Sequence, residues 1–230
     1  MTVMVKNGPP SARNLKPILL KVYSFLYKIY GPQRWWPANS RFEVVVGAIL
    51  TQNTNWSNVE KAINNLKKEK LLSPSILHKI NPERLAALIR PSGYYNMKAK
   101  RLKNFLNFLF SNYNGKLSSM KRVPIEVLRK EVLGVDGIGP ETADSILLYA
   151  LDKPVFVIDA YTRRITECLN IARQGISYDD LQAIFTQNLP VNAGLFNEFH
   201  ALIVMHSKAI CKARPNCEEC IFHSEKRKNR

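Results

Sequence analysis

The chain has 230 residues, enough to bury a full hydrophobic core in one domain or in two small ones. Its 34 lysines and arginines against 18 aspartates and glutamates give a formal net charge of +16, which favours an anionic partner such as nucleic acid. The longest apolar run, residues 44–50, is far shorter than the roughly 20 residues of a membrane-spanning helix. The first residues contain no apolar stretch of the secretory type, so we expect a cytoplasmic, nucleoid-associated protein and no membrane partner.

Helical periodicity covers most of the chain after a loose arm, residues 1–14. Apolar residues recur at three- and four-residue spacing in three stretches: Phe42, Val45, Val46, Ile49 and Leu50; then Val59, Ala62, Ile63 and Leu66; then Leu195, Phe199, Leu202 and Ile203. Turns with proline or glycine separate the helical stretches. The one extended candidate, residues 155–158, is too short to build a sheet, so the pattern predicts an all-α fold.

The segment 134–159, GVDGIGPETADSILLYALDKPVFVID, indicates two helices joined by a tight turn. Gly134 ends the first helix, Gly137-Ile138-Gly139 makes the turn, and Pro140 suits the first position of the second helix. This arrangement is a helix-hairpin-helix.

Glycines in such a turn let the backbone N–H groups approach a phosphate directly. We expect Ile138 to point inward and to fix the hairpin to the body of the domain. A Gly-x-Gly turn alone also fits an ordinary corner between two helices. The following Thr142-Ala143 pair and the single carboxylate Asp159 make the pattern more specific.

Four segments of the chain resemble the helix-hairpin-helix DNA glycosylases of the endonuclease III superfamily. They are GVDGIGPETADSIL (the hairpin), VFVIDAYTRRI (the catalytic-aspartate segment), ILTQNTNWSNVEKAI (the early helix) and RPSGYYNMKAKRL (the Gly-x-Tyr-Asn-x-Lys-Ala segment). The resemblance spans about residues 35–220. It implies a DNA repair enzyme that rotates a damaged nucleotide out of the duplex, with Gln52 near the flipped nucleotide.

The resemblance also implies two helical domains with the DNA groove between them. Residues 38–152 form a helical barrel of the six-helix type that carries the hairpin. Residues 15–37 join residues 153–230 in a second domain with a cysteine loop. We expect a monomer that binds double-stranded DNA with a damaged base or an abasic site.

Asp159 matches the catalytic aspartate of the family. Cleavage of the N-glycosidic bond builds positive charge on the sugar, and a carboxylate stabilises that charge and orients or deprotonates the attacking water. A lone aspartate after an apolar run also suits a helix N-cap. The two roles are compatible, because capping hydrogen bonds hold the carboxylate ionised and aimed.

Glu141 distinguishes this chain from two branches of the family. Bifunctional members place a lysine there, which forms an imine with the sugar, and a carboxylate cannot replace it. Adenine-removing members place serine there and need a glutamate in the early helix, which reads GAILTQ here. We therefore expect a monofunctional glycosylase. The alternatives are a bifunctional endonuclease III-like enzyme for oxidised pyrimidines that uses another lysine, and a non-catalytic DNA-binding module.

Two tryptophans indicate the substrate. The block WWPANSRFEVVVGAILTQNTNW is similar to the 3-methyladenine glycosylases of the endonuclease III type, in which aromatic rings sandwich an alkylated base. The matching residues are Trp36 and Trp56. Ring stacking and a cation–π contribution favour a cationic base. Ordinary core packing is the alternative.

Cys211, Cys217 and Cys220 form a C-x5-C-x2-C pattern that indicates a metal or cluster site. Many members of the family bind a [4Fe–4S] cluster here through four cysteines, but Lys226 stands in the fourth slot. His223 is a candidate fourth ligand. A three-cysteine cluster, a Cys3His zinc site and no metal all stay open. Cys168 is expected to be a small buried residue.

Basic side chains near these segments are candidates for phosphate contacts: Lys98, Lys100 and Arg101 after the Tyr-Asn pair, and Lys208, Lys212 and Arg214 around the cysteines. Each fits an ordinary solvated charge as well.

Overall fold

The computed structural model describes residues 14–212, 220 and 222. Within this part of the chain all regular structure is helical and no strand occurs, so the predicted all-α class is confirmed. The described part of the chain divides into two compact units, residues 36–154 in one and residues 14–35 with those from 155 onward in the other.

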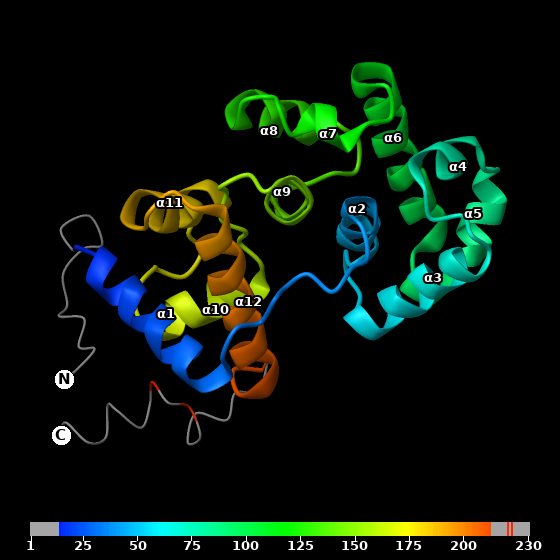
Figure 1. Ribbon diagram of the computed structural model, residues 1–230. Helices are drawn as coiled ribbons and strands as arrows, with labels where there is room; N and C mark the ends of the chain where they lie inside the picture. The colour runs from blue at the N-terminus through cyan, green and yellow to red at the C-terminus, as the bar shows by residue number, and fades with distance from the viewer. Residues whose placement is uncertain (1–13, 213–219, 221, 223–230) are drawn as a thin grey trace. The chain divides into compact units, whose positions relative to one another are not determined.

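The unit formed by residues 36–154 carries the hairpin (Figure 1). Its elements are α2 (Arg41–Leu50), α3 (Trp56–Lys68), α4 (Pro74–Lys79), α5 (Pro82–Leu88), the 3-10 turn η2 (Arg90–Ser92), α6 (Tyr95–Tyr113), α7 (Leu117–Met120), α8 (Ile125–Leu133), α9 (Pro140–Ser145) and the π-helical segment η3 (Ile146–Ala150). The π-helical segment follows α9 without a break. Such segments occur often near functional sites.

Helix α2 is the core element of this unit. Ser40 caps it by accepting the N–H of Glu43 at 3.1 Å, a contact worth about 1 kcal/mol. Every residue after Arg41 is buried, including the whole predicted stripe from Phe42 to Leu50. The helix packs against α3, α6, α9 and η3, so it is covered on all sides.

The second unit consists of α1 (Lys16–Tyr30), α10 (Ala160–Cys168), α11 (Tyr178–Asn188) and α12 (Ala193–Ala209). Helix α12 packs against α1 and α10 (Figure 1). The core of this second unit is aromatic. The ring of Phe156 stacks on Phe185 at 3.9 Å between centroids and meets the rings of Phe196 and Phe199 edge-on. Leu195 of the predicted stripe is only half-buried, and Phe196 is the buried residue at that turn.

Candidate functional site

The hairpin forms as predicted. Helix α8 ends at Leu133 with Gly134 as its C-cap, and Pro140 occupies the first turn of α9. Gly137 has φ of +86°, a left-handed value that favours glycine, and Ile138 is buried. A Cβ on Gly139 would meet nothing within 4 Å, so the backbone is open on that side. The turn therefore has the geometry that lets a ligand approach its backbone.

Gln52 and Arg101 support the hairpin from inside the same unit. The Nε2 of Gln52 donates to Thr142 Oγ1 at 2.9 Å and to the Gly137 carbonyl at 3.3 Å. The Arg101 guanidinium donates to Gln52 Oε1. A Cβ on Gly137 would lie 2.3 Å from Arg101 Cγ, so this packing requires glycine. Gln52 is thus bound to protein groups on both ends of its amide.

The two candidate tryptophans do not form an open sandwich. Trp36 and Trp56 meet edge to face, with centroids 5.2 Å apart and planes at 83°. A base held between parallel rings needs them about 7 Å apart, twice the roughly 3.5 Å contact distance of carbon atoms. The sandwich geometry expected from the resemblance is therefore absent from this conformation.

Gly47 and Tyr149 complete this aromatic cluster. The Tyr149 ring lies 5.2 Å from Trp36, and sequence analysis missed it because its position inside η3 resembles ordinary core. A Cβ on Gly47 would lie 3.3 Å from the Trp36 ring and 3.4 Å from Trp56. Both tryptophans are half-buried, and Trp56 Nε1 donates to Glu60 at 2.7 Å. The cluster is partly open to solvent.

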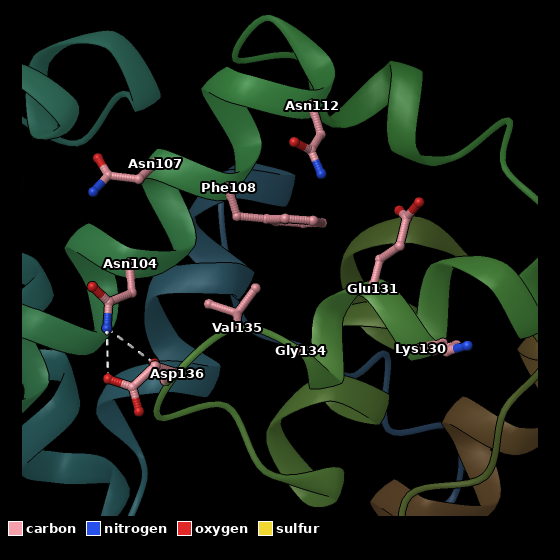
Figure 2. Close-up of a pocket in the computed structure, with 9 residues that line it drawn as sticks. All are labelled: Asn104, Asn107, Phe108, Asn112, Lys130, Glu131, Gly134, Val135 and Asp136. Atoms are coloured by element: carbon pink, nitrogen blue, oxygen red, sulfur yellow. Dashed lines mark hydrogen bonds between the residues drawn. The ribbon is translucent and has the colours of Figure 1, made fainter.

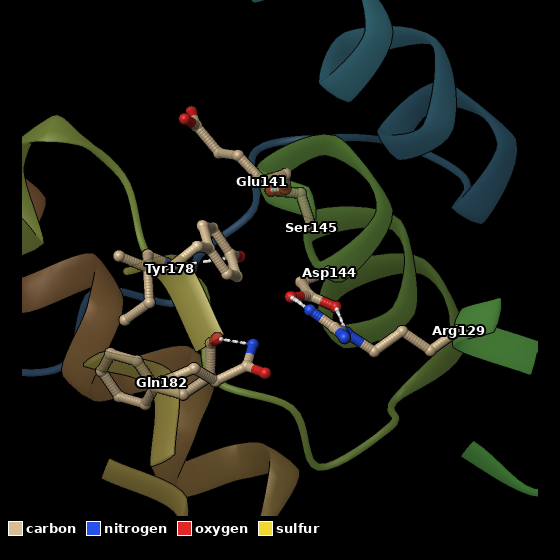
Figure 3. A network of polar contacts seen from close by, with 8 residues as sticks. Arg129, Glu141, Asp144, Ser145, Tyr178 and Gln182 are labelled. Carbon is tan, nitrogen blue, oxygen red and sulfur yellow. Dashed lines mark hydrogen bonds and ion pairs between the residues drawn. The ribbon is translucent and has the colours of Figure 1, made fainter. Parts of the chain in front are cut away.

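Glu141 is exposed in the first turn of α9. One turn further on, Asp144 is fully buried and accepts two hydrogen bonds from Arg129, at 2.8 and 3.1 Å. Figure 3 shows the Glu141 side chain extending away from this ion pair. The pair fixes α8 to α9, and the Glu141 side chain is exposed.

One predicted phosphate contact is wrong. Lys98 is 1% exposed, and its Nζ donates to the carbonyls of Leu50 at 2.9 Å and Ser92 at 2.6 Å. Burial and the neighbouring Arg101 lower its pKa from 10.5 to about 8. Its ammonium ties the end of α2 to η2 and cannot reach DNA. Lys100 and Lys212 are exposed, and Lys100 lies 3.8 Å from Asp136.

Asp159 caps α10. Its Oδ1 accepts the N–H of Thr162 at 2.7 Å, and its Oδ2 lies 3.4 Å from Nε2 of His200 on α12. Burial raises the pKa of this carboxyl, but His200 and the Thr162 N–H lower it further, and the net pKa falls below the usual value. Asp159 is therefore ionised at neutral pH although it is buried. Sequence analysis missed His200, since an isolated histidine on an apolar helix face carries no local signal.

The described cysteines are only part of the predicted metal site. Cys211 and Cys220 are buried, while Cys217 and His223 lie outside the described residues. Among the residues that are described, no three histidine, cysteine or acidic side chains come together as a metal site. Buried thiols are the donor type that a cluster or zinc requires, so the donors present are compatible with either.

His206 lies beside Cys220. Its Nε2 is 3.8 Å from Cys220 Sγ, and its Nδ1 is 3.0 Å from the hydroxyl of Tyr30. Sequence analysis did not identify it. Cys168, expected to be buried, is exposed near the end of α10, because it falls on the solvent side of that helix.

A pocket of about 490 Å³ opens beside the hairpin but holds none of these groups (Figure 2). Amide side chains of α6 line it with Phe108, Glu131 and Asp136, and Asn104 donates to Asp136 at 3.2 Å. No predicted site residue lines it. Its mixed polar wall gives no sign of a particular chemistry.

Comparison with known proteins agrees with these features. Residues 46–190 match the family described as HhH-GPD superfamily base excision DNA repair protein. A Methanocaldococcus jannaschii protein, provisionally named as a DNA repair glycosylase, is 49% identical and aligns with 88% of this chain and 93% of its own. Endonuclease III of Thermotoga maritima is 31% identical over 79% of this chain and 80% of its own.

Solved structures show the same fold. The 3-methyladenine DNA glycosylase of H. pylori has a TM-score of 0.73 and 32% identity, over 84% of this chain and 96% of its own. A non-covalent endonuclease III–DNA complex has a TM-score of 0.77 at 22% identity, over 94% and 99%. In the described part of the chain, no helix has the length and apolar character to cross a membrane. The chain belongs to the HhH-GPD superfamily of base excision DNA repair proteins, and within it to the DNA glycosylases related to endonuclease III.

Proposed function

We propose that this glycosylase is monofunctional and removes alkylated purines from duplex DNA. The proposal that the enzyme is monofunctional rests on Glu141. Glu141 is an exposed carboxylate in the first turn of α9, at the position where the resemblance expects a lysine. A carboxylate cannot form an imine with the sugar. Water is then the nucleophile, the base leaves, and the abasic strand stays intact.

Asp159 is the proposed catalytic group. Its carboxylate stabilises the cationic sugar as the glycosidic bond breaks, and accepts the proton of the attacking water. Its low pKa and its bond to the Thr162 N–H support this role, because both keep the negative charge in place before the substrate arrives.

The aromatic cluster of Trp36, Trp56, Tyr149 and Gly47 supports the proposal for the base. A stacked base gains roughly 1–3 kcal/mol per aromatic contact. Because the two tryptophans now touch edge to face, binding a base between them requires one ring to turn. The H. pylori relative is a 3-methyladenine DNA glycosylase bound to 1,N6-ethenoadenine, which supports an alkylated or otherwise modified purine.

The test is base release from methylated duplex DNA, measured by mass spectrometry, with strand nicking scored in parallel without alkali. We expect 3-methyladenine or 7-methylguanine without nicks. Asp159→Asn should lower the release rate on the order of 10²–10³ fold while DNA binding persists. Asp180→Asn, an exposed change on α11, is the matched control.

Two other results would each support an alternative. Nicks at oxidised pyrimidines with no methylated base released would favour a bifunctional enzyme. If the wild type and Asp159→Asn bind duplex DNA equally and neither releases a base, the protein would be a DNA-binding module.

We further propose that Cys211, Cys217 and Cys220 hold a [4Fe–4S] cluster, with zinc or no metal as alternatives. The burial of Cys211 and Cys220 supports it. Iron, sulfide and zinc analysis of the purified protein, with its visible absorption, distinguishes the three. For DNA contacts we propose the hairpin turn, Lys100 and Lys212. Their substitution should weaken duplex binding and reduce its salt dependence.

A further inference from the structure

Asp159 contacts groups from two different helices, a hydrogen-bond donor on α10 and an imidazole on α12. The Thr162 N–H belongs to the first turn of α10 and meets Oδ1 at 2.7 Å. The imidazole of His200 comes from α12 and places Nε2 3.4 Å from Oδ2. The Thr162 N–H is fixed by the backbone of the capped helix, whereas the position of the His200 imidazole depends on how α12 packs against α10.

The imidazole is itself fixed in an apolar setting. His200 is 5% exposed, and its ring meets that of Phe156 edge-on at 6.3 Å. Phe156 is locked in turn by stacking on Phe185. Electrostatic interactions are stronger in such a water-poor environment than at a surface. The 3.4 Å contact between His200 Nε2 and Asp159 Oδ2 therefore acts on the carboxylate more strongly than the same contact would at a solvent-exposed surface.

Other charged and titratable groups on the neighbouring elements have different partners. Arg163 donates to the carbonyl of Ile176, Arg164 to that of Cys211, and Glu198 accepts the N–H of Gln33. On α11 the hydroxyl of Tyr178 accepts the N–H of Ile158, and Asp179 and Asp180 are exposed. On α1, Tyr23 lies against Phe199 and near Glu198. Among the described residues, His200 is the titratable side chain that lowers the pKa of Asp159.

We propose that His200 is a positioning residue for Asp159, which holds Oδ2 so that the carboxylate stays ionised and oriented during base removal. This inference rests on the proposed role of Asp159. His200 acts through the carboxylate and does not contact DNA. Burial alone raises the pKa of Asp159 and so favours its protonated form, and the Thr162 N–H fixes only one of its oxygens.

The test compares His200→Leu, which removes the polar ring beside Oδ2, with His200→Gln, whose side-chain amide keeps a polar group of similar reach. Single-turnover release of 7-methylguanine from a duplex is followed against pH. With leucine, the acid limb should move to higher pH, and the rate below it should fall tenfold for each unit of that movement. Binding to undamaged duplex should stay the same, and glutamine should restore part of the loss.

A merely structural role predicts another pattern. The acid limb would stay in place, and both variants would lose rate in proportion to lost folding, as measured by thermal melting. In the Asp159→Asn background, His200→Leu should cause no additional loss of rate. A further loss there would overturn the proposal, because it would mean that His200 acts independently of the carboxylate.

The contact between His200 and Asp159 can be tested even if no duplex is a substrate. Carbon-13 NMR titration of the Asp159 carboxyl should give a higher pKa in His200→Leu than in the wild type. His78→Gln is the control, since that ring stacks on Phe110 in the other unit and should leave the titration unchanged. Failure of base release with a shifted carboxyl would reject the proposed function alone. An unshifted carboxyl would reject the pairing.

Discussion

Gln52 and Thr142 are joined by a hydrogen bond of 2.9 Å that links the turn after α2 to the first turn of α9. The same amide also contacts Gly137 and Arg101, so the Gln52 side chain braces the hairpin. Contact with a flipped nucleotide requires these bonds to be exchanged for bonds to DNA. Gln52 is therefore a support of the hairpin in the free protein and a candidate DNA contact only after that exchange.

Gln52→Leu should lower the free energy of unfolding by about 1–3 kcal/mol, because three polar partners lose their contact in a partly buried site. It should also weaken binding to duplex DNA, since the hairpin loses its brace. Urea unfolding and a binding titration measure the two effects. Gln187→Leu, an exposed change on α11, should stay within about 0.5 kcal/mol. Unchanged stability of Gln52→Leu would contradict the bracing role.

Gly137→Ala and Gly139→Ala should separate hairpin stability from hairpin recognition. A methyl group at Gly137 meets Arg101 Cγ at 2.3 Å in a backbone of φ +86°, so this variant should be clearly destabilised. At Gly139 the methyl group meets no protein atom within 4 Å, and the fold should be kept. If the turn binds phosphate, Gly139→Ala should nevertheless weaken duplex binding. Full binding by that variant would argue against a phosphate contact there.

Gly47→Ala should perturb the aromatic cluster more than the fold. Alanine favours a helix by about 1 kcal/mol, which offsets the crowding of a Cβ placed 3.3 Å from Trp36. We therefore expect little change in stability, a shift in tryptophan fluorescence and slower release of bulky bases. Ala48→Gly, which weakens the same helix without adding an atom, is the control. Equal base selectivity in both variants would exclude the cluster from the base pocket.

Lys98→Met should destabilise the protein by about 1–3 kcal/mol, since the Leu50 and Ser92 carbonyls lose their buried donor. The folded pKa of Lys98, about 8, lies below the usual 10.5. The unfolded chain therefore binds this proton more tightly, and its release on folding makes the wild type gain stability as pH rises between these values. Unfolding measured over this range should show that gain in the wild type and not in Lys98→Met. Lys100→Met, an exposed change, should retain it.

Glu141→Lys should create lyase activity if position 141 faces the sugar. An exposed lysine in the first turn of α9 could add to the sugar carbon and form an imine, which borohydride reduces to a stable protein–DNA adduct. Denaturing gels of a borohydride-treated abasic duplex detect it. Glu141→Gln controls for loss of the carboxylate and should give no adduct. Absence of an adduct with lysine would mean that this position is not aimed at the sugar.

Local patterns in the sequence determined the elements. The stripe of α3 is buried at Val59, Ala62, Ile63 and Leu66, as its spacing predicts, because helical periodicity depends only on near neighbours. The hairpin turn follows from Gly137, which has a left-handed backbone, and from Pro140 in the first turn of α9, since both backbone preferences are intrinsic to the residue. The capping role of Asp159 was predictable for the same reason.

Tertiary structure alone decided the partners of these side chains. The sequence alone predicts that Lys98 is a surface charge. In the fold, two backbone carbonyls accept hydrogen bonds from its ammonium, and the side chain is buried. His200 meets Asp159 only because α12 packs against α10. Trp36 and Trp56 touch edge to face, and both rings pack against α2 because Gly47 has no side chain at the contact. Backbone conformation follows from short-range sterics and hydrogen bonds, whereas burial and pairing depend on packing between segments that are distant in the sequence.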